Sequence, residues 1–301
     1  MSDPLRIDVH LHLYPSKEAG MLEKQNYEIW EYGSKHDVVF EPLAGDIDDA
    51  ESAMVAAGFS HVVVANLFAV ALLDEDLRSA GLMAQAEQLK AFNHWACDVT
   101  AGHEGFSVFV AVDPTVLGGE AGAAHLRDMV EHHGARGVKI HPAVQGFAPD
   151  APGMLPIYQT CVDLGIPVLS HTGLTRDGSA YAEPNAFGNV LRAFPQLKLV
   201  LAHLGGGAWR QTVGFAEAFP QATFDLCEII AWTGAPGAPS STELAQLITD
   251  VGPERVMMGT DFPWYGLAET ANQVMELPLL TDDQKTAILG ANASRILQLP
   301  A

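Results

Sequence analysis

The sequence predicts a (β/α)8 barrel, an α/β fold in which eight parallel strands close into a cylinder. Short runs rich in β-branched residues alternate with longer helical patterns along the 301-residue chain. The runs are almost continuously apolar, which is typical of strands buried on both faces of a parallel sheet. Eight such units in a chain of this length match the size of a (β/α)8, or TIM, barrel. We therefore expect a single domain over residues 1–301.

The elements of this barrel can be assigned in order along the chain. The expected strands are 5–11, 61–67, 106–112, 136–142, 166–171, 197–203, 222–226 and 255–261. Among the helices between them, the clearest patterns are 46–58, 120–134 and 155–165. Each of these ends in glycine, the residue preferred just after a helix. A last helix, within 291–299, is expected on the outside of the barrel.

An insertion is expected after the first strand. Residues 14–45 are rich in aromatic and charged side chains, and we expect them to lie over the barrel mouth. The alternative fold, a doubly wound open sheet, would place a glycine-rich phosphate-binding turn here. No such turn follows the first strand, so the barrel is favoured.

Composition and charge limit the functional classes. The chain is 48% hydrophobic and 18% charged, so it can form a core, and no apolar run reaches the ~20 residues of a membrane helix. The N-terminus has no signal-peptide pattern and the three cysteines form no CxxC pair, so we expect a cytoplasmic protein. A formal charge of −21 argues against nucleic-acid and membrane partners. A small-molecule substrate remains, and an anionic one would need a local basic group.

Polar residues recur at the ends of the expected strands, the face on which barrel enzymes carry their active sites. They are His10, His12, Lys139, His141, His171, His203 and Asp261. Because strand side chains alternate, His10 and His12 point the same way. With His171 and Asp261 they could offer three nitrogens and one carboxylate to one ion. This donor set suits a divalent cation, with Zn²⁺ expected and Mn²⁺ as the alternative.

These residues resemble motifs of the amidohydrolase superfamily. The matching segments are DVHLH (8–12), GVKIHPAVQGF (137–147), PVLSHTG (167–173), LAHLGGG (201–207) and MMGTDFPW (257–264). They are most similar to the amidohydrolase-2 branch, which includes aminocarboxymuconate-semialdehyde decarboxylase, aromatic-acid decarboxylases and lactone hydrolases. The resemblance implies metal ligation by His10, His12, His171 and Asp261, and a catalytic role for His203. It also implies a homodimer.

Lys139 has three possible roles. In binuclear members of the superfamily, a lysine from this strand is carbamylated and bridges two metals. Because the amidohydrolase-2 branch is usually mononuclear, we expect instead that Lys139, with His141 on the same face, helps to bind substrate. A structural ion pair with a barrel acid is the third possibility.

The expected activity is hydrolysis. A divalent ion activates a bound water, and Asp261 and His203 can accept its proton or stabilise an oxyanion. We therefore expect a hydrolase of a small lactone, amide or ester. The alternative is a metal-dependent non-oxidative decarboxylase of an aromatic or unsaturated acid, and the third possibility is a non-catalytic binding barrel. Substrate contacts are expected from three residues near strand ends, Arg176 as a carboxylate clamp, Asn66 and Trp232.

Overall fold

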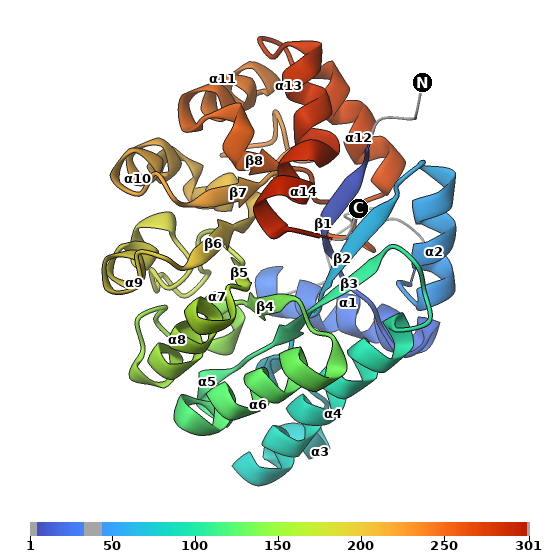
Figure 1. The fold of residues 1–301 in the computed structure, drawn as a ribbon, viewed down its shortest axis with the longest axis vertical. Helices are drawn as coiled ribbons and strands as arrows, with labels where there is room; N and C mark the ends of the chain where they lie inside the picture. The colour runs from blue at the N-terminus through green and yellow to red at the C-terminus, as the bar shows by residue number, and fades with distance from the viewer. Residues whose placement is uncertain (1–4, 33–43, 300–301) are drawn as a thin grey trace.

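The computed structural model describes residues 5–32 and 44–299. Its eight strands form one sheet in the order β1 to β8, and each adjacent pair is parallel. The strands are β1 (Ile7–Leu11), β2 (His61–Ala65), β3 (Phe106–Ala111), β4 (Gly137–Ile140), β5 (Pro167–Ser170), β6 (Lys198–Leu201), β7 (Thr223–Asp225) and β8 (Val256–Met257). Helices surround them (Figure 1). The predicted barrel is confirmed.

The cylinder is joined between the first and last strands. The amide of Val9 donates to the carbonyl of Met258 over 3.0 Å, and Leu11 forms a parallel bridge with Phe262. The amide of Asp261 donates to the carbonyl of His10 over 2.8 Å. These bonds place the end of β1 directly beside the segment that follows β8.

Alternation along the strands divides the side chains into two sets. On β2, Val62 and Val64 belong to the large core between the sheet and its helices, whereas Val63 faces the other way, with Phe109 and Leu169, into the barrel. Farther along the strands, polar side chains such as His10 of β1 and Lys139 of β4 line one cavity. The apolar interior therefore supports a polar layer at the C-terminal ends of the strands.

The helices follow the expected pattern. The predicted helices correspond to α2 (Ile47–Ala56), α6 (Gly119–His133), α8 (Leu155–Leu164) and α14 (Asn292–Leu297), which packs against β1 and β8. The others are α3 (Glu75–Ser79), α4 (Leu82–Thr100), α5 (Pro114–Leu117), α7 (Pro142–Gln145), α9 (Gly188–Ala193), α10 (Thr212–Ala218), α11 (Ser241–Val251), α12 (Leu267–Glu276) and α13 (Asp282–Thr286). Gly134 and Gly165 end their helices with left-handed φ values of 79° and 65°. Within the described ranges, no helix has the length and apolar character needed to cross a bilayer.

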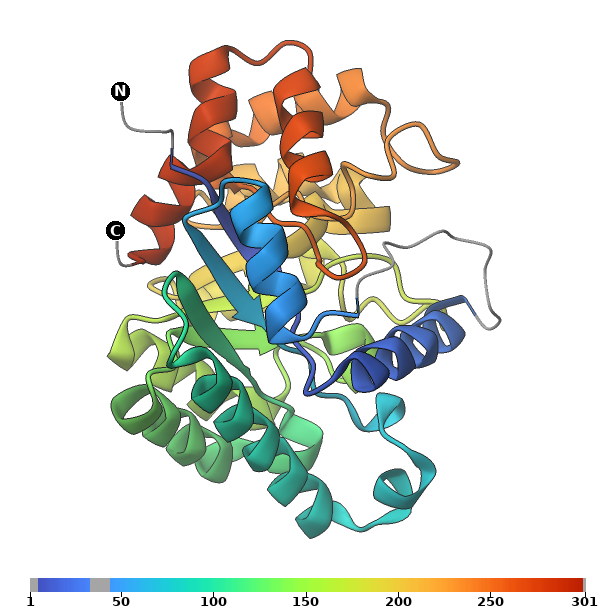
Figure 2. The same cartoon turned by 90° about the vertical axis from the view of Figure 1, so that its right-hand side faces the viewer.

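The segment after β1 forms α1 (Lys17–Tyr32), which lies beside the C-terminal ends of the first strands (Figure 2). Tyr27 and Trp30 on this helix contact the ring of His141, with ring centroids 5.9 and 6.1 Å away. The described part of the predicted insertion therefore covers the barrel mouth. The rest of that prediction, residues 33–43, lies outside the described residues.

Most strands are shorter than predicted, because the polar residues at their ends lie in the turns that follow. His141, His171, His203 and Asp261 all come after the last residue of their strand. His203 and Asp261 adopt left-handed φ values of 60° and 63°. This conformation is costly for a non-glycine residue and is enriched at functional sites.

Candidate active site

The strand-end residues meet in one small cavity of about 30 Å³ at the barrel mouth. Its lining comprises His10, His12, Tyr14, Glu23, Tyr27, Leu67, Lys139, His141, His171, His203, Glu228, Asp261, Trp264 and Tyr265. All seven predicted strand-end residues are in this set. They come from β1, β4 and the turns after β1, β4, β5, β6 and β8. The fold therefore brings together residues that are far apart in the sequence.

Three potential metal ligands are especially close. The Nε2 atom of His12 lies 2.9 Å from Oδ1 of Asp261, and Nε2 of His10 lies 3.5 Å from the same oxygen. Burial lowers the pKa of His10 to about 4 and also lowers that of His12, so both imidazoles are neutral. Burial opposes the charge of Asp261, but the adjacent His10 and His12 outweigh it and keep its pKa low. Neutral imidazoles and an ionised carboxylate are the forms that bind a cation.

Asp225 orients His10 from behind. Its Oδ2 lies 3.1 Å from Nδ1 of His10, and its Oδ1 accepts the amide of His203 over 2.8 Å. Burial disfavours the charge of this carboxylate, but the attraction of His10 prevails and lowers its pKa to about 2. His10 must then donate from Nδ1, which leaves the lone pair of Nε2 directed at the cavity.

Asp8 joins β1 to the turn that carries Asp261. Its Oδ1 accepts the amides of His10 and Thr260 over 2.9 and 3.1 Å, and its Oδ2 accepts the Thr260 hydroxyl. Asp8 and Asp225 were not singled out from the sequence. For Asp8, the available sequence signal was its place two residues before His10 on the same strand. For Asp225, it was an acid at the end of β7, a strand whose end faces His10.

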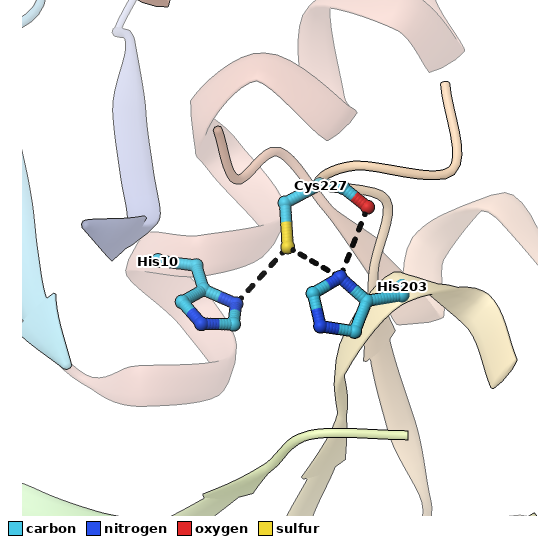
Figure 3. Close-up of side chains that lie close together, drawn as sticks. All are labelled: His10, His203 and Cys227. Atoms are coloured by element: carbon cyan, nitrogen blue, oxygen red, sulfur yellow. Dashed lines mark hydrogen bonds between the residues drawn. The ribbon is translucent and has the colours of Figure 1, made fainter. Parts of the chain in front are cut away.

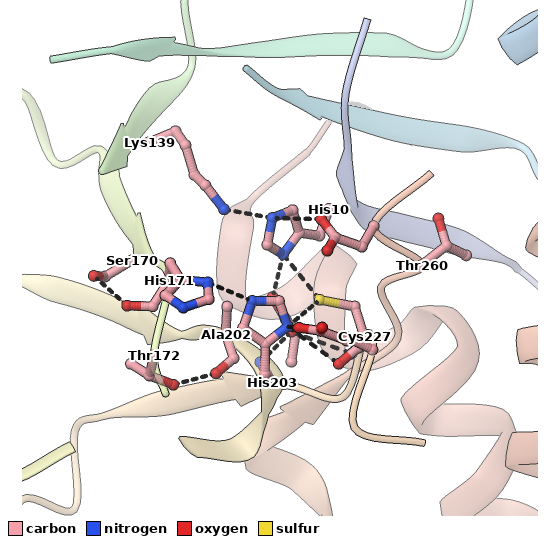
Figure 4. Close-up of polar contacts among 12 residues, drawn as sticks. His10, Lys139, Ser170, His171, Thr172, Ala202, His203, Cys227 and Thr260 are labelled. Carbon is pink, nitrogen blue, oxygen red and sulfur yellow. Dashed lines mark hydrogen bonds and ion pairs between the residues drawn. The ribbon is translucent and has the colours of Figure 1, made fainter. Parts of the chain in front are cut away.

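His203 and His171 form a directed pair (Figure 4). Nδ1 of His203 lies 3.2 Å from the carbonyl oxygen of Cys227, which can only accept, so this nitrogen is the donor in the pair. Nε2 of His203 then accepts from Nδ1 of His171 over 3.0 Å. The remaining nitrogen of His171, Nε2, is left unprotonated and can serve as a ligand.

His171 is predicted as the fourth ligand, but it does not belong to the group of ligand atoms that lie closest together. The ligand atoms of His10, His12 and Asp261 lie within 4.8 Å of one another, and His171 is not in this group within the described chain. It lines the same cavity and stacks on His141, with ring centroids 3.7 Å apart and planes at 8°. Its role as the fourth ligand remains a prediction.

Cys227 lies between two histidines (Figure 3). Its Sγ is 3.0 Å from Nδ1 of His10 and 3.0 Å from Nδ1 of His203. Burial raises the pKa of this thiol well above its usual value, so it is protonated. The thiol therefore packs against both rings as a neutral group.

Lys139 is fully inside the barrel. Its Nζ contacts Nε2 of His10 (Figure 4), and burial lowers its pKa. This shift disfavours the ammonium form that substrate binding would use, although nearby Asp261 partly opposes it. The structure therefore places Lys139 at the ligand cluster and leaves its role as a prediction.

The three predicted substrate contacts differ in position. Arg176 is not among the described lining residues of either cavity, and its Nη1 donates to the carbonyl of Trp30 over 2.9 Å. Its role as a carboxylate clamp remains a prediction. Asn66 is buried and accepts the amide of Leu13 over 2.8 Å, so it supports the backbone and does not line the cavity. Trp232 lines a neighbouring cavity of about 320 Å³.

This donor set fits a divalent cation. Two imidazole nitrogens and a carboxylate oxygen converge, and a third imidazole lines the same cavity. In addition, a buried carboxylate holds one of the imidazoles in the tautomer that a ligand needs.

A family model described as Amidohydrolase matches residues 7–299. A curated relative, the 2-amino-3-carboxymuconate-6-semialdehyde decarboxylase of Dictyostelium discoideum, is 23% identical over 98% of this chain and 92% of its own length. The Caenorhabditis elegans protein of the same name is 33% identical over 37% of this chain and 30% of its length.

Solved structures share the fold. The 5-carboxyvanillate decarboxylase LigW of Sphingomonas paucimobilis superimposes with a TM-score of 0.72 and 16% identity, over 99% of this chain and 100% of the other. The dihydroxybenzoic acid decarboxylase of Polaromonas sp. JS666, solved with manganese and 2-nitroresorcinol, gives a TM-score of 0.69 and 16% identity, covering 98% and 97%.

These comparisons contradict the expectation of a hydrolase. The curated relatives are named as decarboxylases, as are the two solved structures described above. The chemical parts expected for a hydrolase are present, but the same parts serve a decarboxylase, and the sequence motifs do not distinguish the two. The alternative expectation is therefore the better supported one.

Proposed function

Because the chain belongs to the amidohydrolase family, whose model matches residues 7–299, we propose that it is a metal-dependent decarboxylase of a small aromatic or unsaturated acid. The observation that carries this proposal is the similarity to a decarboxylase along 98% of the chain. The cavity at the barrel mouth supports it, since it combines a cation-binding donor set with groups that can move a proton.

His10, His12 and Asp261, with His171, would hold the ion. A bound divalent cation would supply a positive charge that fixes the substrate carboxylate and a neighbouring oxygen. Both Zn²⁺ and Mn²⁺ accept mixed nitrogen and carboxylate ligands, and the Polaromonas decarboxylase was solved with manganese. Elemental analysis of the purified protein would decide between them.

The chain itself must supply a proton. In a non-oxidative decarboxylation the carbon–carboxylate bond breaks, carbon dioxide leaves, and the carbon that carried it gains one proton. His203 and Asp261 are the groups best placed to hold that proton, since both line the cavity. The bond from Nδ1 of His203 to the Cys227 carbonyl directs Nε2 toward His171 and the cavity.

Aromatic side chains limit the access of water to this chemistry. Trp264 packs edge-on against His12, with ring centroids 5.5 Å apart, and Tyr27 packs against Trp264 with centroids 5.8 Å apart. The hydroxyl oxygen of Tyr27 also lies 3.1 Å from Nε2 of His141. A small and largely covered cavity favours protonation of carbon over attack by water.

The test is a product assay. Metal-loaded protein is incubated in D₂O with carboxyl-labelled hydroxybenzoates and, separately, with lactones and amides. We expect labelled carbon dioxide and one deuterium in the product, and we expect neither from His203→Asn or from chelated protein. Acid release from lactones or amides without any carbon dioxide from the acids would overturn the proposal.

A further inference from the structure

Glu23 is a carboxylate in the active-site cavity for which the mechanism above has no use. It lies on α1 and lines the cavity together with Tyr14 and Tyr27. Burial raises its pKa to about 7. Within the described residues, the Glu23 side chain makes no hydrogen bond or ion pair, and it is not among those with an interaction left unstated. A half-buried acid that faces a cavity in this way is available to a ligand.

The walls around Glu23 are acidic. Glu228 and Asp261 line the same cavity, and Glu228 also lines the neighbouring one. Among the described lining residues, Lys139 is the one basic side chain other than histidine, and it lies against His10 at the ligand cluster. Arg176, which could have bound a second carboxylate, donates to the carbonyl of Trp30 instead.

The neighbouring cavity offers a larger volume with mainly uncharged walls. It has a volume of about 320 Å³ and shares three lining residues with the first cavity, Tyr27, His171 and Glu228. Apolar walls come from Ile229 and Trp232, and the described lining holds no lysine or arginine. A ring or short chain whose reacting carboxylate is at the ligand cluster therefore extends past carboxylates into a space that offers no lysine or arginine on its described lining.

We propose that Glu23 is a specificity-determining residue that selects substrates carrying one carboxylate and a hydroxyl or amino donor, and that excludes substrates with a second carboxylate. This inference rests on the proposed function. A hydroxyl or amino group can donate to the Glu23 carboxylate, which is the main form above about pH 7. A second carboxylate at the same position would meet a like charge, and the one lysine on the described walls, Lys139, lies against His10 instead. The formal charge of −21 acts in the same direction, since a dianion is repelled more than a monoanion.

Two ligands test this inference directly. The compounds 3-hydroxybenzoate and benzene-1,3-dicarboxylate differ only in a hydroxyl or a carboxylate at one ring position. Binding to metal-loaded protein is measured at about pH 8, where Glu23 is mainly ionised. Calorimetry follows it, and so does fluorescence, because Trp232 and Trp264 line the cavities. Wild type should bind the hydroxy acid at least about tenfold more tightly than the dicarboxylate.

Substitutions on α1 show whether the binding preference depends on Glu23 itself or on the net charge of the protein. Glu23→Gln should reduce the preference by about tenfold, and Glu23→Lys should reverse it. Glu18→Gln removes an equal charge from an exposed position of the same helix and should leave the preference as in wild type.

Equal or tighter binding of the dicarboxylate by wild type would overturn the inference, as would an unchanged preference in both Glu23 variants. If hydroxybenzoates are decarboxylated while the preference ignores Glu23, the inference alone fails. If neither acid binds and neither loses carbon dioxide, the proposed function fails and the inference fails with it.

Discussion

Replacing Asp225 with asparagine tests how the barrel directs His10 at the cation. The two oxygens of Asp225 accept from two different donors, Nδ1 of His10 at 3.1 Å and the amide of His203 at 2.8 Å. Asparagine has nearly the same shape but one acceptor and one donor. Either two donors then face each other, or His10 moves its proton to Nε2 and loses the lone pair that would bind the cation. The site is fully buried, which means that water cannot relieve the conflict.

The magnitude follows from this loss. Removing a group that orients a metal-binding histidine weakens metal affinity by roughly 10- to 100-fold, or about 1.4–2.8 kcal/mol. The same buried mismatch should lower the free energy of unfolding by about 1–3 kcal/mol.

The assay is competition for the metal ion with a chelator of known affinity, followed on wild type and Asp225→Asn. Asp163→Asn on α8 is the matched control, because Asp163 is 48% exposed in its side chain and lies far from the site in the fold. A dissociation constant for Asp225→Asn within about threefold of wild type would refute the orienting role.

Three further outcomes are expected. His12→Ala should abolish carbon dioxide release while the circular dichroism spectrum stays that of a folded barrel, and near-normal turnover would contradict its assignment as a ligand. Glu23→Gln should change how the free energy of unfolding depends on pH, because burial raises the pKa of Glu23 to about 7. In wild type, the stability that the neutral Glu23 side chain contributes is fully present below about pH 4.5. It is lost as the pH rises through about 7, by up to about 3 kcal/mol. Urea denaturation of wild type and variant at about pH 5 and about pH 8 measures this change, and a stability difference independent of pH would contradict it. Trp232→Ala should raise KM by about tenfold and leave kcat nearly unchanged, since it removes an apolar wall that does not touch the reacting carbon, and an equal loss in kcat would place Trp232 in the chemical step.

The barrel could be predicted because its strands are buried on both faces. HVVVA in β2 and KLVL in β6 are runs that only a covered parallel sheet explains. The ends of the strands were harder to predict. His203 follows β6 in a left-handed conformation that the apolar pattern does not encode.

The cavity residues on strand ends could also be predicted, because period-two alternation and strand order bring them to one rim. Loop residues could not be predicted in the same way. The direction of Arg176 depends on where α1 presents the carbonyl of Trp30, which is a tertiary contact. Glu23 was missed for the same reason, since nothing local distinguishes it from the other acids of α1.

The type of reaction was the hardest feature to predict from the sequence. Asp261, His203 and a divalent ion are compatible with attack by water and with protonation of carbon. The choice between them depends on the substrate and on how far water is excluded, and neither is encoded in the strand-end motifs.

The most direct test of the metal centre is a crystal of this protein soaked in Mn²⁺ and measured at the manganese absorption edge. The account predicts one anomalous peak at about 2.0–2.3 Å from Nε2 of His10, Nε2 of His12 and the Asp261 carboxylate. A peak elsewhere on the molecule, with none at these three side chains, would contradict it.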